Sequence, residues 1–158
     1  MQQLSHPFPP LYDDRSRILI LGSFPSVKSR ETAFFYGHPQ NRFWRVLSRL
    51  LDAPAPQTVE EKSALLHAHH IALWDVIASC RIEGSSDSSI RDAAPNDLTL
   101  ILQAAPIRAV FCNGASSYVL YQKHQAKATG LAAVQLPSTS PANAAWSLDR
   151  LTDAWRVI

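Results

Sequence analysis

Short apolar segments alternate with helical segments along this chain, and the alternation constrains the fold more than any other feature. Four apolar runs have the length of β-strands: RILILGS (17–23), IALWDVI (71–77), IRAVFCNG (107–114) and LAAVQLP (131–137). Their apolar residues are nearly continuous, as in strands that are buried on both faces. Because helical segments lie between the runs, the pattern predicts a parallel sheet with helical crossovers.

The segments between the runs carry helix signals. Residues 41–51 place Phe43, Val46, Leu47, Leu50 and Leu51 on one side, which predicts an amphipathic helix. Further helices are predicted after a Thr58–Glu61 capping box, after Asn96 as an N-cap, over 116–124, and from Ser147 onward. Residues 24–40 and 80–90 are predicted to be loops, and loops as long as the first are usually functional.

These elements predict the fold class. Residues 1–158 are expected to form a single α/β domain, a three-layer α/β/α sandwich around a central four-stranded parallel sheet. In such sheets ligands bind at the carboxyl ends of the strands. The site is therefore expected where the sequences GSFPS, WDVIAS, FCNG and LPSTSP follow the four strands.

Several classes of protein are disfavoured. No apolar run approaches the roughly 20 residues that span a bilayer, and the N-terminal residues do not resemble a secretory signal. Cys80 and Cys112 are isolated, so we expect neither a disulfide framework nor an iron–sulfur cluster, and a cytoplasmic location. No GxGxxG, GxxxxGK[ST] or GxSxG motif is present. The positions of His67, His69 and His70 are more typical of the C-terminal end of a helix than of a metal site.

Positive charge gathers in the first third of the sequence. Between residues 15 and 49 there are seven basic residues and the single acid Glu31, which leaves a net charge of +6, against +2 for the whole chain. This pattern is compatible with an ordinary solvated surface. It is also compatible with a local field that attracts phosphates.

The segment from Gly22 to Asn41 has an unusual composition for a loop. Gly22 is expected to allow a sharp turn after the strand, and Pro39 to fix the approach to Asn41 at the start of a helix. Asn41 has two interpretations: an N-cap of that helix, or a functional amide. Tyr36 is likewise either a half-buried loop aromatic or a contact for a ligand.

Three motifs resemble a known family. GSFPS (22–26) followed by YGHPQNRFW (36–44) resembles the first motif of the uracil-DNA glycosylase superfamily and is close to that of its mismatch-specific branch. LPSTSPANA (136–144) resembles the second motif, a loop that clamps DNA beside a flipped nucleotide. WDVIASC (74–80) and DSSI (87–90) look most like the hypoxanthine (deoxyinosine) DNA glycosylase branch.

The resemblance implies a monofunctional DNA glycosylase that removes a deaminated base, most simply hypoxanthine. The alternatives are a uracil or mismatch-specific glycosylase and a non-catalytic nucleic-acid-binding module. The implied partner is double-stranded or single-stranded DNA with a deaminated base, and we expect a monomer without a metal or other cofactor. The chain departs from its relatives in four positions. Ser23 and Phe24 stand where others carry an acid or amide, and Ser138 where others carry histidine or asparagine. Asp75 stands where others carry a base-reading asparagine.

The resemblance also implies roles for individual residues. Asn41 is the candidate catalytic residue, whose carbonyl oxygen is expected to orient the attacking water. Tyr36 is expected to stack on the flipped base, with Ser23, Phe24 and Asp75 also at the base. Asp75 would accept the N1–H of hypoxanthine; otherwise it is a capping or ion-paired carboxylate. The candidate DNA-binding residues are Lys28, Arg30, Arg42, Arg45, Ser138, Thr139, Ser140 and Asn143.

Overall fold

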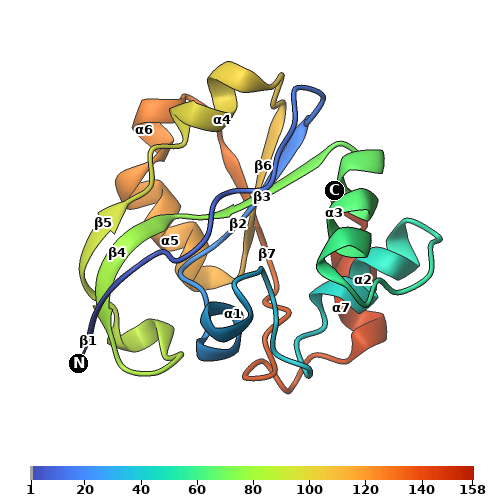
Figure 1. Cartoon of the computed structure of the whole chain (residues 1–158), viewed down its shortest axis with the longest axis horizontal. Helices are drawn as coiled ribbons and strands as arrows, with labels where there is room; N and C mark the ends of the chain where they lie inside the picture. The colour runs from blue at the N-terminus through green and yellow to red at the C-terminus, as the bar shows by residue number, and fades with distance from the viewer. Residues whose placement is uncertain (1) are drawn as a thin grey trace.

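A four-stranded parallel sheet lies at the centre of the computed structural model, which describes residues 2–158 (Figure 1). Its strands are, in spatial order, β3 (Ile71–Asp75), β2 (Ile18–Gly22), β6 (Ala109–Asn113) and β7 (Ala133–Leu136). All three pairings are parallel. The four predicted strands and the parallel sheet are therefore confirmed.

Helices cover both faces of this sheet and complete the three layers (Figure 1). One side holds α2 (Phe43–Leu50), α3 (Val59–Ala68) and α7 (Leu148–Ala154), which is followed by the 3₁₀ turn η2 (Trp155–Val157). The other side holds α4 (Thr99–Ala104), α5 (Ala115–His124) and α6 (Ala126–Thr129). Leu19, Ile20 and Leu21 of β2 have no exposed surface, as expected for a central strand between two helical layers.

Local signals in the sequence place several helix ends correctly. Thr58 and Glu61 form the predicted capping box, and the Ser147 side chain accepts a hydrogen bond from the Arg150 N–H at 3.1 Å. The Asn96 prediction is wrong. Asn96 is buried, and its side-chain nitrogen donates to the main-chain carbonyls of Asp75 and Ile77, at 2.8 and 3.2 Å, instead of capping α4.

The two predicted loops contain regular structure. Residues 24–40 include the short helix α1 (Val27–Thr32), which Ser26 caps. Residues 80–90 overlap β4 (Ile77–Ile82) and the 3₁₀ turn η1 (Asp87–Ser89). A prediction of loop failed there because the polar, mostly exposed residues carry neither a helical nor a strand periodicity.

β4 belongs to a second, antiparallel sheet that the sequence did not indicate. Its order is β1 (Gln2–Ser5), β4 and β5 (Arg91–Pro95). β4 follows β3 almost without interruption, and the Ile77 N–H donates to the Ser23 carbonyl at 3.1 Å. The second sheet therefore brings the N-terminal segment and residues 83–90 to the carboxyl ends of β2 and β3.

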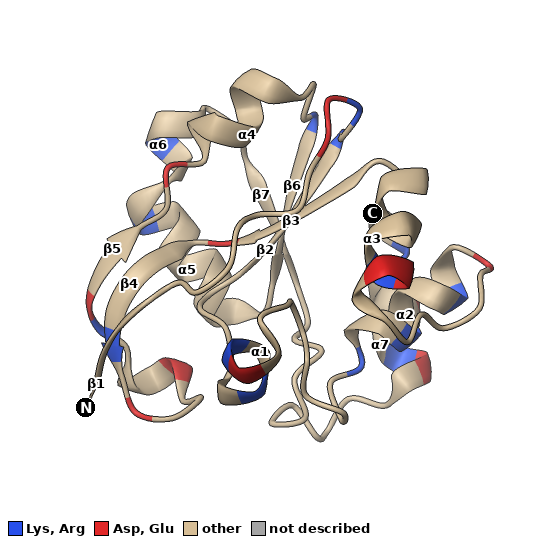
Figure 2. Ribbon diagram, viewed as in Figure 1, with Lys and Arg blue, Asp and Glu red and all other residues tan. Residues whose placement is uncertain are grey.

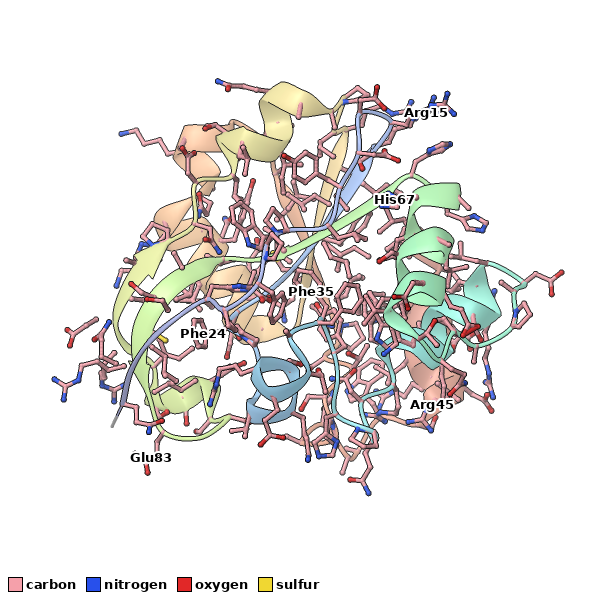
Figure 3. All side chains as sticks on the ribbon, in the orientation of Figure 1. Arg15, Phe24, Phe35, Arg45, His67 and Glu83 are labelled. Atoms are coloured by element: carbon pink, nitrogen blue, oxygen red, sulfur yellow. The ribbon has the colours of Figure 1, made fainter. Side chains whose placement is uncertain are left out.

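The basic residues between 15 and 49 do not form one patch. Arg15 precedes β2 at one end of the molecule, whereas Arg45 lies at the opposite end (Figure 3). Basic and acidic segments are interspersed in Figure 2. The loops at the bottom of the view, in the space between α1 and α7, carry few charges. The structure thus divides the positive stretch, and only its later part lies near the carboxyl ends of the strands.

Two further features bear on the expectations about cysteines and membranes. Cys80 and Cys112 are buried free thiols, and burial raises the pKa of Cys112 to about 12. Within residues 2–158, none of the helices has the length and apolar character needed to cross a membrane.

Candidate active site

A cavity of about 120 Å³ opens at the carboxyl ends of the parallel strands. An adjoining groove of about 700 Å³ shares part of its wall, including Asp87, Asn113, Ser138 and Ser140. The polar side chains in the wall of the cavity include Ser23, Tyr36, Asn41, Asp75, Asp87, Asn113 and Thr139. A small cavity beside a larger groove suits a polymeric ligand in which one compact group enters the cavity and the rest lies in the groove.

Tyr36 is held rigidly against α2. Its ring stacks on Phe43 with centroids 4.1 Å apart, and its backbone adopts a positive φ of 53°. Such a conformation is unusual for a residue with a side chain and is found mainly where surrounding contacts impose it. The Tyr36 hydroxyl is buried and has no hydrogen-bond partner within residues 2–158. Burial, assisted by the nearby Asp75, raises the pKa of Tyr36, so the hydroxyl stays a neutral donor.

Other aromatic side chains form the apolar part of the wall. Phe8, Phe24 and Phe35 line the cavity, and the rings of Phe8 and Phe35 meet edge to face with centroids 4.8 Å apart. Phe24 and Phe35 are labelled near the centre of the molecule in Figure 3. Flat apolar walls of this kind favour a planar ligand.

Asn41 lines the same cavity and is fixed through its carbonyl oxygen. Oδ1 accepts hydrogen bonds from the Phe43 N–H at 3.0 Å and from the Thr139 hydroxyl at 2.9 Å. The Phe43 N–H can only donate, so the oxygen must point toward it and Nδ2 away from it. Both lone pairs of Oδ1 are therefore engaged, and the carbonyl has no free position for the water that we expected it to orient.

Thr139 links Asn41 to the sheet. The Thr139 side chain is fully buried, and its hydroxyl accepts from Asn113 Nδ2 at 3.0 Å, while its N–H donates to Asn113 Oδ1 at 3.0 Å. The Arg42 N–H donates to the Thr139 carbonyl at 3.0 Å. This network joins the end of β6, the loop after β7 and the start of α2, which makes Asn41 a rigid group.

Asp75 occupies the end of β3 and is paired with a residue that we did not predict. His6 Nε2 lies 2.7 Å from Asp75 Oδ2, and the exposed fractions of the two side chains are 5% and 6%. The other ring nitrogen of His6 lies 2.8 Å from the Phe8 carbonyl. His6 thus fixes the orientation of the Asp75 carboxylate through Oδ2, and Oδ1 lies close to Gly22.

Gly22 is needed for a reason other than the expected turn. A Cβ at this position would lie 2.4 Å from Asp75 Oδ1 and 3.3 Å from the Tyr36 hydroxyl oxygen. Because Gly22 belongs to β2 and lacks a positive φ, the close approach of Asp75 excludes a side chain there, rather than the backbone conformation.

Asp87 brings a second carboxylate to the cavity. Its Oδ1 accepts a hydrogen bond from the Ser23 hydroxyl at 2.8 Å. The residue as a whole is exposed, but the surrounding protein atoms desolvate its carboxyl group and raise its pKa. The Ser23 hydrogen bond partly offsets this rise, and the charge of Asp75 adds to it.

Comparison with known proteins identifies the family. The family model of the uracil DNA glycosylase superfamily matches residues 9–158. The chain belongs to the uracil DNA glycosylase superfamily. The predicted resemblance and fold are thereby confirmed.

Relatives from two archaea support the same assignment within this superfamily. The chain is 36% identical over 113 residues to a hypoxanthine DNA glycosylase of Methanosarcina barkeri, a match that covers 70% of this chain and 71% of that protein. It is 32% identical over 152 residues to a hypoxanthine DNA glycosylase of Methanosarcina acetivorans, with 96% and 95% covered. A solution NMR structure from Methanosarcina acetivorans, described as a candidate uracil DNA glycosylase, superimposes with a TM-score of 0.84 at 32% identity and covers 99% of this chain and 96% of that one.

The structure brings most of the predicted base-site residues into one cavity. Its wall includes Ser23, Phe24, Tyr36, Asn41, Asp75, Ser138, Thr139 and Ser140, whereas Lys28, Arg30, Arg42, Arg45 and Asn143 lie outside it. Asn143 lines the adjoining groove, and its side-chain nitrogen donates to the Ser138 carbonyl at 3.0 Å.

The basic residues differ in how free they are to meet DNA. The guanidinium of Arg42 donates to the main-chain carbonyls of Ser140 at 2.9 Å, Asn143 at 3.0 Å, and Trp146, so this side chain shapes the second motif. Arg30 similarly donates to the Pro25 and Gly84 carbonyls. Lys28 forms an exposed ion pair with Glu31, and Arg45 is exposed with one weak contact of 3.4 Å to Gln40.

Three polar residues of the site were missed from the sequence, namely His6, Asp87 and Asn113, and so were the apolar wall residues Phe8 and Phe35. Asn113 ends the FCNG strand, whose carboxyl end was already expected at the site, so its position was a usable signal. Asp87 lies in the DSSI segment, which was noted only for its resemblance. His6 is 69 residues from Asp75 in sequence, and no local pattern announces their contact.

His67, His69 and His70 lie near the end of α3 and are not arranged as a metal site within the part of the chain that the structure describes. His67 Nδ1 lies 3.2 Å from an Asp13 carboxylate oxygen. Among residues 2–158, no group of three or more His, Cys, Asp or Glu side chains is arranged to hold a metal ion.

Proposed function

We propose that this protein is a monofunctional DNA glycosylase that hydrolyses the N-glycosidic bond of hypoxanthine in deoxyinosine. The observation that carries the proposal is the pairing, in one cavity, of a stacked aromatic platform, Tyr36, with an oriented carboxylate, Asp75. Both Methanosarcina relatives named as hypoxanthine DNA glycosylases support it.

A base in a duplex is out of reach of any side chain, so the nucleotide is extruded first, at a cost of a few kcal/mol. Tyr36 receives the base on the face of its ring that Phe43 does not cover. Stacking of this kind contributes about 1 to 3 kcal/mol and tolerates different bases. The platform therefore offsets much of the extrusion energy without choosing the base.

Asp75 supplies the choice. A carboxylate only accepts hydrogen bonds, and hypoxanthine presents N1–H where adenine presents an unprotonated N1. His6 holds Asp75 Oδ2, so Oδ1 remains for the base. Adenine in the same position would place two acceptors against each other, which disfavours it.

Asn41 remains the candidate catalytic residue, with a revised role. Because Oδ1 is engaged by Phe43 and Thr139, the group available to the reaction is Nδ2, which donates. An amide N–H positioned on the oxygen of the attacking water holds that water in line with the sugar carbon. Such positioning by a rigid group lowers the barrier without a change in protonation.

The DNA strand is proposed to lie along the adjoining groove. Ser138, Ser140 and Asn143 line it with hydroxyl and amide groups, and Arg45 and Lys28 provide exposed positive charge outside the cavity. Such contacts position the phosphates without reading sequence. Single-stranded and double-stranded DNA both satisfy this arrangement, and one chain is sufficient to form it.

Base release from defined duplexes tests the proposal. The protein is incubated with duplexes that carry one deoxyinosine, deoxyuridine or normal base, and abasic sites are then cleaved with alkali. We expect strand cleavage at deoxyinosine only after alkali, because no separate lyase step is proposed. Cleavage only at deoxyuridine would instead assign a uracil glycosylase, and binding without cleavage would assign a non-catalytic module.

A further inference from the structure

Because the carbonyl oxygen of Asn41 is already hydrogen-bonded, the hydrolytic step needs another group to accept a proton. A water molecule that attacks the sugar must give up a proton. Both lone pairs of Asn41 Oδ1 are engaged by Phe43 and Thr139, and Nδ2 only donates. The proton acceptor therefore has to come from another part of the cavity wall.

Two carboxylates line the cavity, and they differ in the atoms that they leave free. Asp75 has one oxygen on His6 at 2.7 Å and the other packed against Gly22 beside the proposed base contact. Asp87 Oδ1 accepts from Ser23 at 2.8 Å. Within residues 2–158, no hydrogen bond or ion pair engages Asp87 Oδ2. Asp87 thus presents a free acceptor atom.

The segment that carries Asp87 is docked on α1. The Val27 N–H donates to the Ser85 hydroxyl at 2.9 Å, and Arg30 Nη2 donates to the Gly84 carbonyl at 3.2 Å. Ser86 stands at the N-cap of η1 without a side-chain capping hydrogen bond, and Asp87 is the acid of the first turn. These contacts give the carboxylate a defined place although its loop is largely exposed.

We propose that Asp87 is the general base of the hydrolysis and that Ser23 holds its carboxylate in position. This role rests on the proposed function. The water oxygen bonds to C1′ of the sugar while the bond from C1′ to the base breaks and its electron pair leaves with the base. One proton of the water passes to Asp87 Oδ2. The departing base takes a proton from solvent, and Asp87 later returns its own, so no further reactant is consumed.

The electrostatic surroundings suit a base that works near neutral pH. Desolvation raises the pKa of Asp87, the Ser23 hydroxyl lowers it in part, and Asp75 of β3 raises it further. A higher pKa makes a carboxylate a better proton acceptor, provided that it stays ionised. The other titratable groups near this carboxylate are Tyr36 and Cys80 of β4, and the charge of Asp87 helps to raise the pKa of each.

The position of Asp87 has a second consequence. The residue also lines the groove proposed for the DNA strand, where a negative charge repels phosphates. Removal of this charge should therefore strengthen DNA binding while it slows base release. A residue that serves only the fold would not change binding and chemistry in opposite directions.

The test compares Asp87→Asn with the wild-type protein. Asp92→Asn is the matched control, because Asp92 is an exposed acid on β5, outside the cavity, and lies 4.0 Å from Arg81. Release of base is followed under single-turnover conditions at saturating enzyme. Affinity is measured with a duplex that carries a tetrahydrofuran abasic analogue, which cannot be hydrolysed.

We expect Asp87→Asn to slow release by on the order of a hundredfold or more, as for loss of a general base, and to bind the analogue at least as tightly as wild type. Asp92→Asn should release base at the wild-type rate. Release by Asp87→Asn within about threefold of wild type would overturn the proposal. The measurement applies to whichever base the wild type releases, so a protein that releases only uracil would refute the hypoxanthine assignment and still decide the role of Asp87.

The pH profile provides the second measurement. Asp87 acts when ionised, so the rate should fall as the pH drops through its raised pKa, at a higher pH than for an ordinary aspartate. Ser23→Ala removes the hydrogen bond that lowers this pKa, so the acidic fall should move to still higher pH. The residual activity of Asp87→Asn should lack this fall. An unchanged profile in both variants would contradict the proposal.

Discussion

On one side of the cavity Asn41 is held by groups that are bonded to one another, whereas on the other side two carboxylates approach without a bond between them. We call the first the amide side, formed by Asn41, Asn113 and Thr139, and the second the acid side, formed by His6, Asp75 and Asp87. Apart from Asn41 Nδ2, every side-chain polar atom named in the amide network has a partner, so that side is rigid and electrically neutral. On the acid side, desolvation raises the pKa of Asp87, and the like charge of Asp75 adds to the rise.

The difference indicates which side of the cavity positions the reacting groups and which side takes part in proton transfer. A fully bonded network positions a group accurately but offers few atoms to a reaction. A carboxylate whose pKa is raised by its surroundings is unfavourable for folding, and such groups are frequent at functional sites. We therefore expect substitutions on the amide side to affect positioning, and those on the acid side to affect proton transfer and choice of base.

The largest effect is expected at Asn41, and the comparison with Thr139 sharpens it. Asn41→Ser can still cap α2 but lacks the side-chain nitrogen, so single-turnover release should fall by about a hundredfold or more with near-normal DNA binding. Thr139→Val keeps that nitrogen and removes one hydrogen bond to Asn41, so it should lower the melting temperature more than the rate. If Asn41→Ser keeps most of its rate, Asn41 is only a cap.

An intermediate effect is expected for base choice at Asp75 and His6. The two rings of hypoxanthine reach farther into the cavity than the single ring of uracil, so its release depends more on Asp75. Asp75→Asn should lower the ratio of hypoxanthine to uracil release by about tenfold, or about 1.4 kcal/mol. Equal losses on both bases, with a lower melting temperature, would assign Asp75 to folding.

His6 provides a control for this result. The nitrogen of glutamine reaches nearly as far as His6 Nε2 and can donate to Asp75 Oδ2. His6→Gln should therefore keep the wild-type ratio, whereas His6→Ala should lower it toward that of Asp75→Asn. Identical ratios in the two His6 variants would show that the hydrogen bond does not serve base choice.

The smallest effects on base release are expected for the two arginines, of which Arg42 should affect stability and Arg45 the binding of DNA. Arg42→Lys loses hydrogen bonds to the second motif, which should cost about 2 kcal/mol and lower the melting temperature by about 4 to 8 °C. Arg45→Gln should leave melting unchanged. It should reduce the slope of log affinity against log salt by up to about 0.9, as expected for one phosphate contact. A reduced slope in Arg42→Lys alone would return Arg42 to the DNA-binding surface.

The parallel sheet was predictable from the sequence because β2, β3 and β6 are buried along most of their length. Short apolar runs such as ILIL in β2 are typical of buried strands. The antiparallel sheet was not predictable, since β1 and β5 are mostly exposed and their residues follow no clear alternation. Its strands form because pairing partners exist elsewhere in the chain, and this information is not local.

The same distinction separates the two sides of the site. Asn41 stands in a motif with a recognisable helix start, and Thr139 in a second motif at a strand end, so both could be named beforehand. The contact between His6 and Asp75 depends on the β1–β4 pairing, and that between Ser23 and Asp87 on the docking of residues 83–90. The acid side therefore required the structure.

The contact between Gly22 and Asp75 has an evolutionary consequence. A methyl group at position 22 and a carboxylate at position 75 cannot occupy their present places together, because the two would be 2.4 Å apart. Any descendant that acquires a side chain at position 22 must first shorten or displace residue 75, and with it the group that faces the base. The two positions are thus expected to change in a fixed order, so that a shift in the preferred base precedes any loss of this glycine.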